Sequence, residues 1–305
     1  TSVAYGIFRA EGNVTKATYG MLIGAVINMI LDPIFIYTMN LGVFGAGLAS
    51  ILSLAFVSLL LIYWFKKESY VDFSLKNFNF QLGLIKKILS VGIPAGIEML
   101  IVAFVNLFIN SLLLLVGDIQ GVAVYNAGWR VIMTAFVVPM AIGMSTVAVT
   151  GANYGAGKFE NLKVIYNYTI KFGLLIVTLM AIFIFVFAPQ ISYLFAYLPE
   201  LVDVRSLLTE FLRVTCLFYF FIPLGITASS VFQGVGKGFS SLIITIIRLL
   251  LFEMVFAYIL AIVCGFGQYG VWYGTILGNG IGSIFGYFYA RRYINRLNKK
   301  ELAVK

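Results

Sequence analysis

Two polar residues stand four positions apart inside a long apolar stretch of the chain. Asn28 and Asp32 interrupt the apolar run at residues 17–38, and Pro33 follows directly. Residues four apart share one face of a helix. An unpaired carboxylate near the middle of a bilayer costs about 2.5–3.5 kcal/mol even on the insertion scale. Asp32 must therefore face protein, water or an ion.

The chemistry of this pair suits a small cation. Pro33 has no N–H, so the helical bond to the carbonyl of Met29 is lost. A carboxylate, an amide oxygen and a free carbonyl are hard oxygen ligands, which suit a proton or a small hard cation. We expect Asn28 and Asp32 to belong to a cation site.

The composition indicates which elements hold these residues. Hydrophobic residues make up 61% of the 305 residues and charged residues 11%, with a mean hydropathy of +1.00. Soluble domains are about 45–50% apolar and about 25% charged. We therefore expect an all-α integral membrane protein, because helices satisfy their own backbone in lipid. Eight apolar runs are long enough to cross a bilayer, at residues 17–38, 44–65, 88–116, 120–149, 162–187, 206–233, 239–264 and 269–293.

Basic residues indicate how these spans are oriented. The net charge is +9, and most Lys and Arg residues fall in the segments on one side, including 66–87 and the C-terminus. The positive-inside rule makes this side cytoplasmic. The charge thus points to membrane topology and not to nucleic acid. We expect a multi-pass protein of the plasma membrane, in contact with membrane lipids, whose 66–87 linker and C-terminus are cytoplasmic.

The residue content argues against an enzyme. The sequence has no His, which excludes His ligation of a metal and His general-base catalysis. Its two Cys make no disulfide framework. GANYGAGK (151–158) and GVGKG (234–238) resemble phosphate loops but lack the Ser or Thr that should follow the Lys. We expect no enzymatic activity, and no cofactor beyond a coupling ion.

Two pairs of stretches indicate an internal repeat. FRAEGN (8–13) is similar to FQGVGK (232–237), and GVFGAGL (42–48) is similar to GQYGVWY (267–273). Six predicted spans fit into one period of about 224 residues, and an even number makes the copies parallel. The first copy would then begin about 140 residues before Thr1, with room for about four more spans. We expect a C-terminal fragment of a twelve-span protein. At this offset Phe252 and Phe256 replace Asn28 and Asp32, so the fold does not require the polar pair.

The motifs together resemble the archaeal and bacterial branch of the multidrug and toxic compound extrusion (MATE) family. They are FRAEGN, N-x-x-x-D-P at 28–33, GVFGAGLAS (42–50), VGIPAGIE (91–98), YNAGWR (125–130) and GANYGAGK. The resemblance runs over essentially the whole chain. It implies two six-helix bundles around a cleft, of which eight helices are present. The domains would be a partial N-lobe (1–65), a linker (66–87), a complete C-lobe (88–296) and a tail (297–305).

The resemblance also implies the identity of the cation site. In the similar branch this site uses an Asn and an Asp in the same pattern, a Thr on the following helix and an Asp on the first helix. Asn28 and Asp32 match directly, and Ser50 stands at the Thr position. These three residues would bind the coupling ion, Na⁺ or H⁺. The first helix lies outside this sequence.

Further polar residues in the second half are candidates for a substrate cleft. Glu98 and Arg130 come within about 10 Å in depth at helical rise. They would form a structural ion pair, hold a cationic substrate or relay protons. Amphipathic and polarizable side chains nearby suit varied drugs, although such residues also make ordinary contacts between helices; they are Asn106, Asn110, Tyr125, Asn126, Trp129 and Met133.

Other residues in these spans carry weaker signals. Arg248 and Glu253 are five apart, which matches one face of an α-helix poorly. Some family members have an acidic residue one turn beyond Glu98 and an Asp on the tenth helix. This chain has Val102 at the first position and no Asp within 206–233. Gly274, Gly278, Gly282 and Gly286 form a stripe that suits close helix packing.

We therefore expect a monomeric secondary antiporter that exports drug-like organic cations in exchange for Na⁺ or H⁺ by alternating access of two lobes. One alternative is a flippase for lipid-linked saccharides, which would need a more cationic cleft. A second is an intramembrane enzyme, which would need a nucleophile and base at matching depth. A third is a non-transporting scaffold, if the natural chain is this short.

Overall fold

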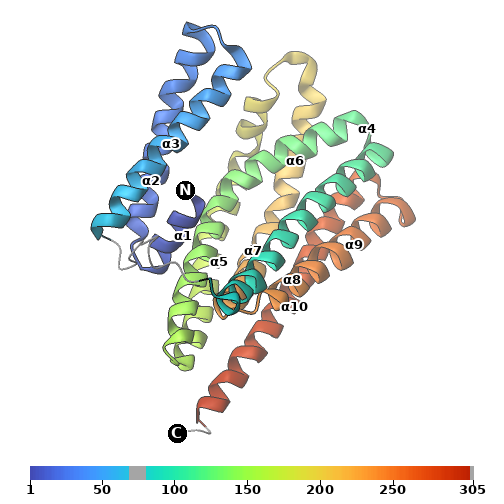
Figure 1. Cartoon of the computed structure of the whole chain (residues 1–305). Helices are drawn as coiled ribbons and strands as arrows, with labels where there is room; N and C mark the ends of the chain where they lie inside the picture. The colour runs from blue at the N-terminus through green and yellow to red at the C-terminus, as the bar shows by residue number, and fades with distance from the viewer. Residues whose placement is uncertain (69–79, 303–305) are drawn as a thin grey trace. The chain divides into compact units, whose positions relative to one another are not determined.

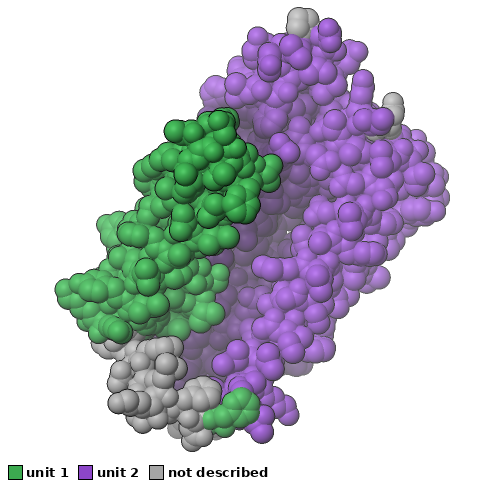
Figure 2. Space-filling view, turned by 45° about the horizontal axis from the view of Figure 1, so that its top comes forward, with its two compact units in different colours: residues 1–81 green, residues 82–305 purple. Residues whose placement is uncertain are grey.

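The computed structural model describes residues 1–68 and 80–302. These residues form helices and no strand, as expected of an all-α membrane protein. They divide into two compact units, unit 1 (Thr1–Gln81) and unit 2 (Leu82–Lys305), coloured separately in Figure 2. The division falls inside the predicted 66–87 linker, of which residues 69–79 lie outside the described part.

Unit 1 consists of α1 (Ser2–Ala10), α2 (Val14–Pro33), the π-helix η1 (Ile34–Thr38) and α3 (Gly42–Glu68). Val14–Thr38 and Gly42–Lys67 are each long and apolar enough to cross a membrane, close to the predicted 17–38 and 44–65. Buried side chains of Phe8, Val57 and Leu61 pack α1 against α3.

Unit 2 contains the longer helices (Figure 1). They are α4 (Leu82–Gly155), α5 (Phe159–Phe195), η3 (Pro199–Leu201), α6 (Val202–Tyr219), α7 (Ile222–Gly234), α8 (Gly238–Thr245), η4 (Ile246–Glu253), α9 (Met254–Tyr258), η5 (Ile259–Val263) and α10 (Gly267–Leu302). Of these, η4 and η5 are π-helices, and α8 through η5 form one continuous span, Gly238–Val263.

The long helix α4 holds two predicted spans, 88–116 and 120–149. Asn126 Nδ2 donates to Asn110 Oδ1 at 2.9 Å although the residues are 16 positions apart. A straight helix would separate them by about 24 Å, so the chain reverses direction between them. Figure 1 shows the two segments, teal and green, running in opposite directions. Each segment, Leu82–Gly117 and Ile119–Gly155, is long enough to cross a bilayer.

The last spans differ more from expectation. The predicted span 206–233 is a broken pair, α6 and α7, bent by 46° just before Pro223. Within the described residues, six helices are apolar and long enough to span a membrane, or seven with this pair. The predicted span 269–293 is helical as part of α10, but α10 does not meet the same test. Its buried Thr275, Asn279 and Ser283 face protein and lower its hydropathy. It continues to Leu302, into the predicted 297–305 tail, whose last three residues lie outside the described part.

The internal repeat is visible in backbone geometry. Gly12, after α1, donates its N–H to Arg9 O at 3.1 Å, and Gly236, after α7, donates to Gln233 O at 3.0 Å. Both glycines have left-handed φ angles, +82° and +76°, which glycine adopts without steric cost. The two turns therefore have the same conformation, as the sequence similarity predicted.

The far ends of the two copies are out of step by one residue. Met39 N–H donates to Ile34 O at 2.9 Å after η1, and Cys264 N–H donates to Ile259 O at 2.9 Å after η5. Met39 and Cys264, which are equivalent, are one position further apart in the sequence than Gly12 and Gly236 are. The second copy therefore has one extra residue between the turns, and its additional π-helix, η4, lies there. A π turn accommodates the extra residue because its bonds join residues i and i+5.

The glycine stripe on α10 locates the insertion. A Cβ added to any of these glycines would collide with the span opposite; at Gly282 it would lie 2.5 Å from Arg248 Cα. Gly282 meets Arg248, Gly278 meets Glu253, Gly274 meets Ala257 and Gly270 meets Ala261. These glycines are always four positions apart. The residues that they meet are five positions apart between Arg248 and Glu253 and four positions apart after that.

The extra residue thus lies between Arg248 and Glu253. Asn28 corresponds to Glu253, and Asp32 corresponds to Ala257. The predicted counterparts, Phe252 and Phe256, are wrong by one position, because a fixed offset takes no account of the insertion in η4.

Close packing at the stripe makes a stability prediction. Gly278→Ala places a methyl group against the backbone of Glu253, and overpacking of this kind costs about 1–3 kcal/mol. We expect a lower melting temperature for the detergent-solubilised full-length protein. Gly96→Ala is the control, because a Cβ at Gly96 meets nothing within 4 Å. Equal melting temperatures for the two variants would contradict the close contact.

Candidate functional site

Two of the three residues predicted for the cation site in unit 1 contact each other. Asn28 on α2 donates from Nδ2 to Ser50 Oγ on α3 at 3.5 Å. Asp32 lies one turn beyond Asn28 and is half-buried. The structure therefore brings the amide and the hydroxyl together across two helices. Asp32 remains a predicted ligand, since no hydrogen bond to its carboxylate is present within the described residues.

Glu98 and Arg130 do not form the ion pair that was one of the alternatives for them. Glu98 Oε2 accepts a hydrogen bond from Gln233 Nε2 on α7 at 3.4 Å. The same nitrogen donates to Ser241 Oγ on α8 at 3.3 Å. Arg130 is exposed on the second segment of α4. The two residues match in depth, but Glu98 faces α7 and α8.

The predicted cleft residues divide into two groups. Asn106, Asn126, Arg130 and Met133 are exposed on α4, as residues of an open cleft must be. Trp129 instead packs into the interior of unit 2, with its ring 5.6 Å from that of Phe218 in an edge-to-face arrangement. The structure places Trp129 behind the exposed residues and not among them.

Sequence reasoning missed a charged cluster in the same unit. The unit 2 charge cluster consists of Arg248, Glu253 and Asn279. Glu253 is 5% exposed, and its Oε2 accepts a hydrogen bond from Asn279 Nδ2 on α10. Arg248 precedes Glu253 in the same π-helix, η4.

The π-helix explains why the sequence did not reveal this cluster. Arg248 and Glu253 are five positions apart, which is a mismatch for an α-helix but the spacing of one i to i+5 bond in η4. The inference that they lie on different faces is therefore wrong. The signal that was available is the extra residue in the second copy of the repeat.

The surroundings of Arg248 are built to admit its side chain. The guanidinium lies over Gly225 on α7, where an added Cβ would be 3.5 Å from Arg248 Cζ and 2.8 Å from Ser283 Oγ. Arg248 Nε is buried without a hydrogen-bond partner in the protein. Buried polar atoms normally have partners, so this cluster has capacity to bind something more.

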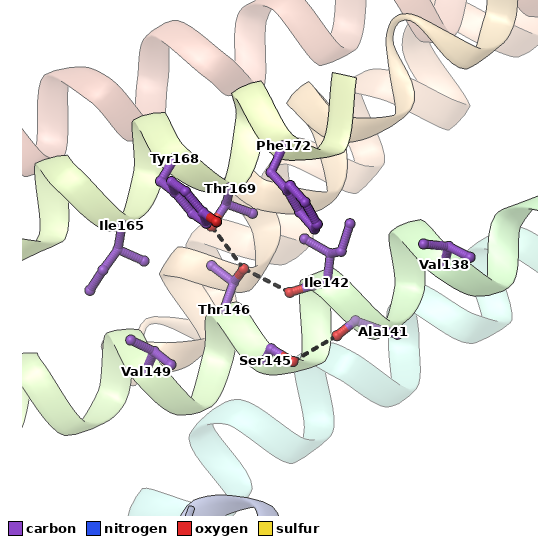
Figure 3. Close-up of a pocket in the computed structure, with 10 residues that line it drawn as sticks. All are labelled: Val138, Ala141, Ile142, Ser145, Thr146, Val149, Ile165, Tyr168, Thr169 and Phe172. Atoms are coloured by element: carbon purple, nitrogen blue, oxygen red, sulfur yellow. Dashed lines mark hydrogen bonds between the residues drawn. The ribbon is translucent and has the colours of Figure 1, made fainter. Parts of the chain in front are cut away.

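An apolar pocket of about 460 Å³ lies elsewhere in unit 2, between the second segment of α4 and α5 (Figure 3). Its Ser and Thr hydroxyls bond within the protein: Thr146 Oγ1 donates to Ile142 O at 2.8 Å and lies 3.3 Å from Thr169 Oγ1, and Ser145 Oγ donates to Ala141 O. The volume suits a small molecule, but the surface offers apolar contact. Its lining is Val138, Ala141, Ile142, Ser145, Thr146, Val149, Ile165, Tyr168, Thr169 and Phe172, without any predicted cleft residue.

The burial of Glu253 makes a second stability prediction. Asn279→Leu removes the amide that donates to Glu253, and leaving a buried acceptor without its hydrogen bond costs about 1–3 kcal/mol, or more for a charged group. We expect a large fall in melting temperature. Asn106→Leu is the matched control, because Asn106 is exposed and its Nδ2 bonds only within α4, to Val102 O. Similar melting temperatures for both variants would show that Asn279 is not needed to stabilise Glu253.

Comparisons with known proteins agree with this architecture. A sequence profile of the MatE family matches residues 94–259, more than half of the chain. Multidrug export protein MepA of Staphylococcus haemolyticus (strain JCSC1435) is 26% identical over 239 residues, which are 78% of this chain and 52% of the relative. MepA of Staphylococcus aureus (strain MSSA476) is 26% identical over 241 residues, with 79% and 52% covered. The chain thus spans about half the length of the curated relatives it matches.

Two solved structures give the same result at higher identity. An outward-facing multidrug resistance MATE family transporter of the MOP superfamily is 38% identical, with a TM-score of 0.94 over 97% of this chain and 66% of that one. A MOP superfamily transporter from Pyrococcus furiosus Vc1 (DSM3638) has the same identity, TM-score and coverage. Together with the internal repeat and the matching profile, these likenesses show that the chain belongs to the MatE family, the multidrug and toxic compound extrusion family that its motifs resemble.

Proposed function

We propose that this chain works as part of a secondary antiporter that exports drug-like organic cations in exchange for Na⁺ or H⁺. Membership of the MatE family is the observation that carries this proposal. The similarity to multidrug export protein MepA supports the substrate class. Transport would proceed by alternating access of two lobes, of which unit 2 is one.

The coupling ion would bind at Asn28, Asp32 and Ser50. The hydrogen bond between Asn28 and Ser50 supports this assignment, because it joins two helices at the predicted site. Asp32 supplies the negative charge that a proton or Na⁺ neutralises. The ion must bind the two conformations with different affinity, since equal affinity would shift no equilibrium. Neutralised Asp32 would favour the packing of α2 and α3 in which the drug is released outward.

The exposed face of α4 supports a binding surface for varied cations. Asn106 and Asn126 offer hydrogen bonds, and Met133, 47% exposed, offers a polarizable surface. Arg130 is the charged residue of this group. A flippase for lipid-linked saccharides would need more cations here, and Arg248 lies one π-helical turn from the acidic Glu253. Drug export is therefore the better proposal.

We propose that the basic ends of the helices lie on the cytoplasmic side of the membrane. In unit 2 the start of α4, the α4–α5 turn, the α7–α8 turn and the end of α10 lie on one side, because successive spans reverse direction. These ends carry Lys87, Lys158, Lys237 and Arg296. The positive-inside rule supports a cytoplasmic location for them in a multi-pass plasma-membrane protein. We also propose that the protein acts as a monomer among membrane lipids.

Replacement of the carboxylate tests the coupling site. Asp32→Asn keeps the shape and removes the charge, so we expect ion-driven efflux of a fluorescent organic cation to fall to the level of protein-free liposomes. The full-length protein is reconstituted into proteoliposomes, and Na⁺ and pH gradients are imposed separately, so that the driving ion is identified as well.

Asp203→Asn is the matched control. Asp203 is exposed in the first turn of α6, outside the proposed site, and we expect wild-type efflux from this variant. Wild-type efflux from Asp32→Asn under the same gradient would show that the carboxylate is structural.

A further inference from the structure

Three buried polar atoms of unit 2 belong to residues around one small cavity and have no hydrogen-bond partner in the protein. They are Trp129 Nε1 on α4, and Trp272 Nε1 and Thr275 Oγ1 on α10. Trp272 is 1% exposed and Thr275 is 5% exposed. Buried N–H and O–H groups normally have a partner, because an unpaired one loses the bonds it made to water in the unfolded chain. These three atoms therefore call for a ligand.

The cavity lies between α4, α6 and α10. Trp129, Trp272 and Thr275 all line it, and its volume is about 10 Å³. Two further aromatic rings in its lining connect the tryptophans. The ring of Tyr125 lies 5.8 Å from that of Trp129 and 5.7 Å from that of Phe211. The ring of Phe211 lies 5.1 Å from that of Trp272. The two indoles thus belong to one continuous aromatic wall.

The size of the cavity restricts what it can hold. One water molecule needs about 10–15 Å³ of such space, whereas a drug-like ligand needs a pocket of about 300–1,000 Å³. A metal ion is a poor match, because two of the three unpartnered atoms are N–H donors and small hard metal ions need oxygen ligands. The ligand must therefore be very small and must accept hydrogen bonds.

The neighbourhood of the cavity disfavours an anion. Thr275 lies one turn before Asn279 on α10, and Asn279 Nδ2 donates to Thr275 O at 3.2 Å. The same nitrogen donates to the buried carboxylate of Glu253. An anion in the cavity would lie close to this negative charge in the interior of a membrane-spanning unit, where repulsion is only weakly screened. A neutral ligand avoids that cost.

The hydrogen-bonding groups match those of water. An indole N–H only donates, whereas a Thr hydroxyl both donates and accepts. A buried water typically makes about three hydrogen bonds. It can accept one bond from each indole and donate one of its own protons to Thr275 Oγ1. All three unpartnered atoms are then satisfied by a single molecule.

We propose that this cavity binds one structural water molecule, held by Trp129, Trp272 and Thr275. The water joins α4 to α10 through hydrogen bonds, one turn from the amide that contacts Glu253. It also gives Trp129, which the sequence suggested as a cleft residue, a role in the interior of unit 2. The site is separate from the predicted cation site and does not depend on the proposed antiport function.

A crystal structure of the full-length protein tests the water directly, at a resolution that shows other buried waters. We expect one density peak in the cavity, within about 3.2 Å of Trp129 Nε1, Trp272 Nε1 and Thr275 Oγ1. An empty cavity in the wild-type protein would overturn the proposal. This measurement needs no variant, so it remains decisive if a substitution prevents folding.

Two matched variants test which residues hold the water. Thr275→Val replaces the hydroxyl by a methyl group of the same size, and we expect the peak to be lost. Thr215→Val is the control: Thr215 lines the same cavity, but its Oγ1 donates to Phe211 O at 2.8 Å, so the peak should remain. Persistence of the peak in Thr275→Val, or its loss in both variants, would overturn the assigned set of partners.

Discussion

The close contact between the glycine face of α10 and the opposing Gly238–Val263 span is the constraint on which the rest of unit 2 depends. A Cβ added at Gly270 or Gly282 would lie only 2.5 Å from the opposing backbone. No side chain can be inserted there without moving a helix. The facing residues are therefore held in register, and an extra residue in the opposing span must be absorbed within it. The π-helix η4 is the result.

This local change determines where the charges lie. In an α-helix Arg248 and Glu253 would point in different directions, and each would need its own partner in the membrane interior. In η4 both act on one another, and Gly225 on α7 leaves room for the guanidinium. Buried charges are stable only when partners surround them, and three separate helices provide those partners here.

Much of the fold follows from the sequence. The apolar runs marked every long helix, because helices are the only way for such segments to satisfy their backbone in lipid. The FRAEGN and FQGVGK turns marked the repeat because both need a glycine with positive φ. The bend before Pro223 and the π-helices were not predicted, since they depend on which residues face a neighbouring helix.

The sequence also predicted part of the candidate site, namely the part that depends on motif positions and not on which face a residue presents. Asn28 and Ser50 could be joined because each lies at a motif position on adjacent helices. Depth made an ion pair one of the alternatives for Glu98 and Arg130, but depth does not determine the face that a residue presents. Glu253 was passed over because the spacing rule assumed an α-helix throughout. An alignment of the two copies that allows one inserted residue would have matched Glu253 with Asn28.

The comparison of the two copies separates what the fold needs from what function adds. Both copies need small residues where α3 or α10 crosses the opposing span, and Gly45 and Gly270 supply them. Neither copy needs a charge at the position of Asn28 and Glu253, because an amide is accommodated there in one copy and a carboxylate in the other. A buried carboxylate that an amide can replace is not retained for packing. The difference in charge between the equivalent Asn28 and Glu253 is the physical reason to look for bound protons or ions in both units and not in unit 1 alone.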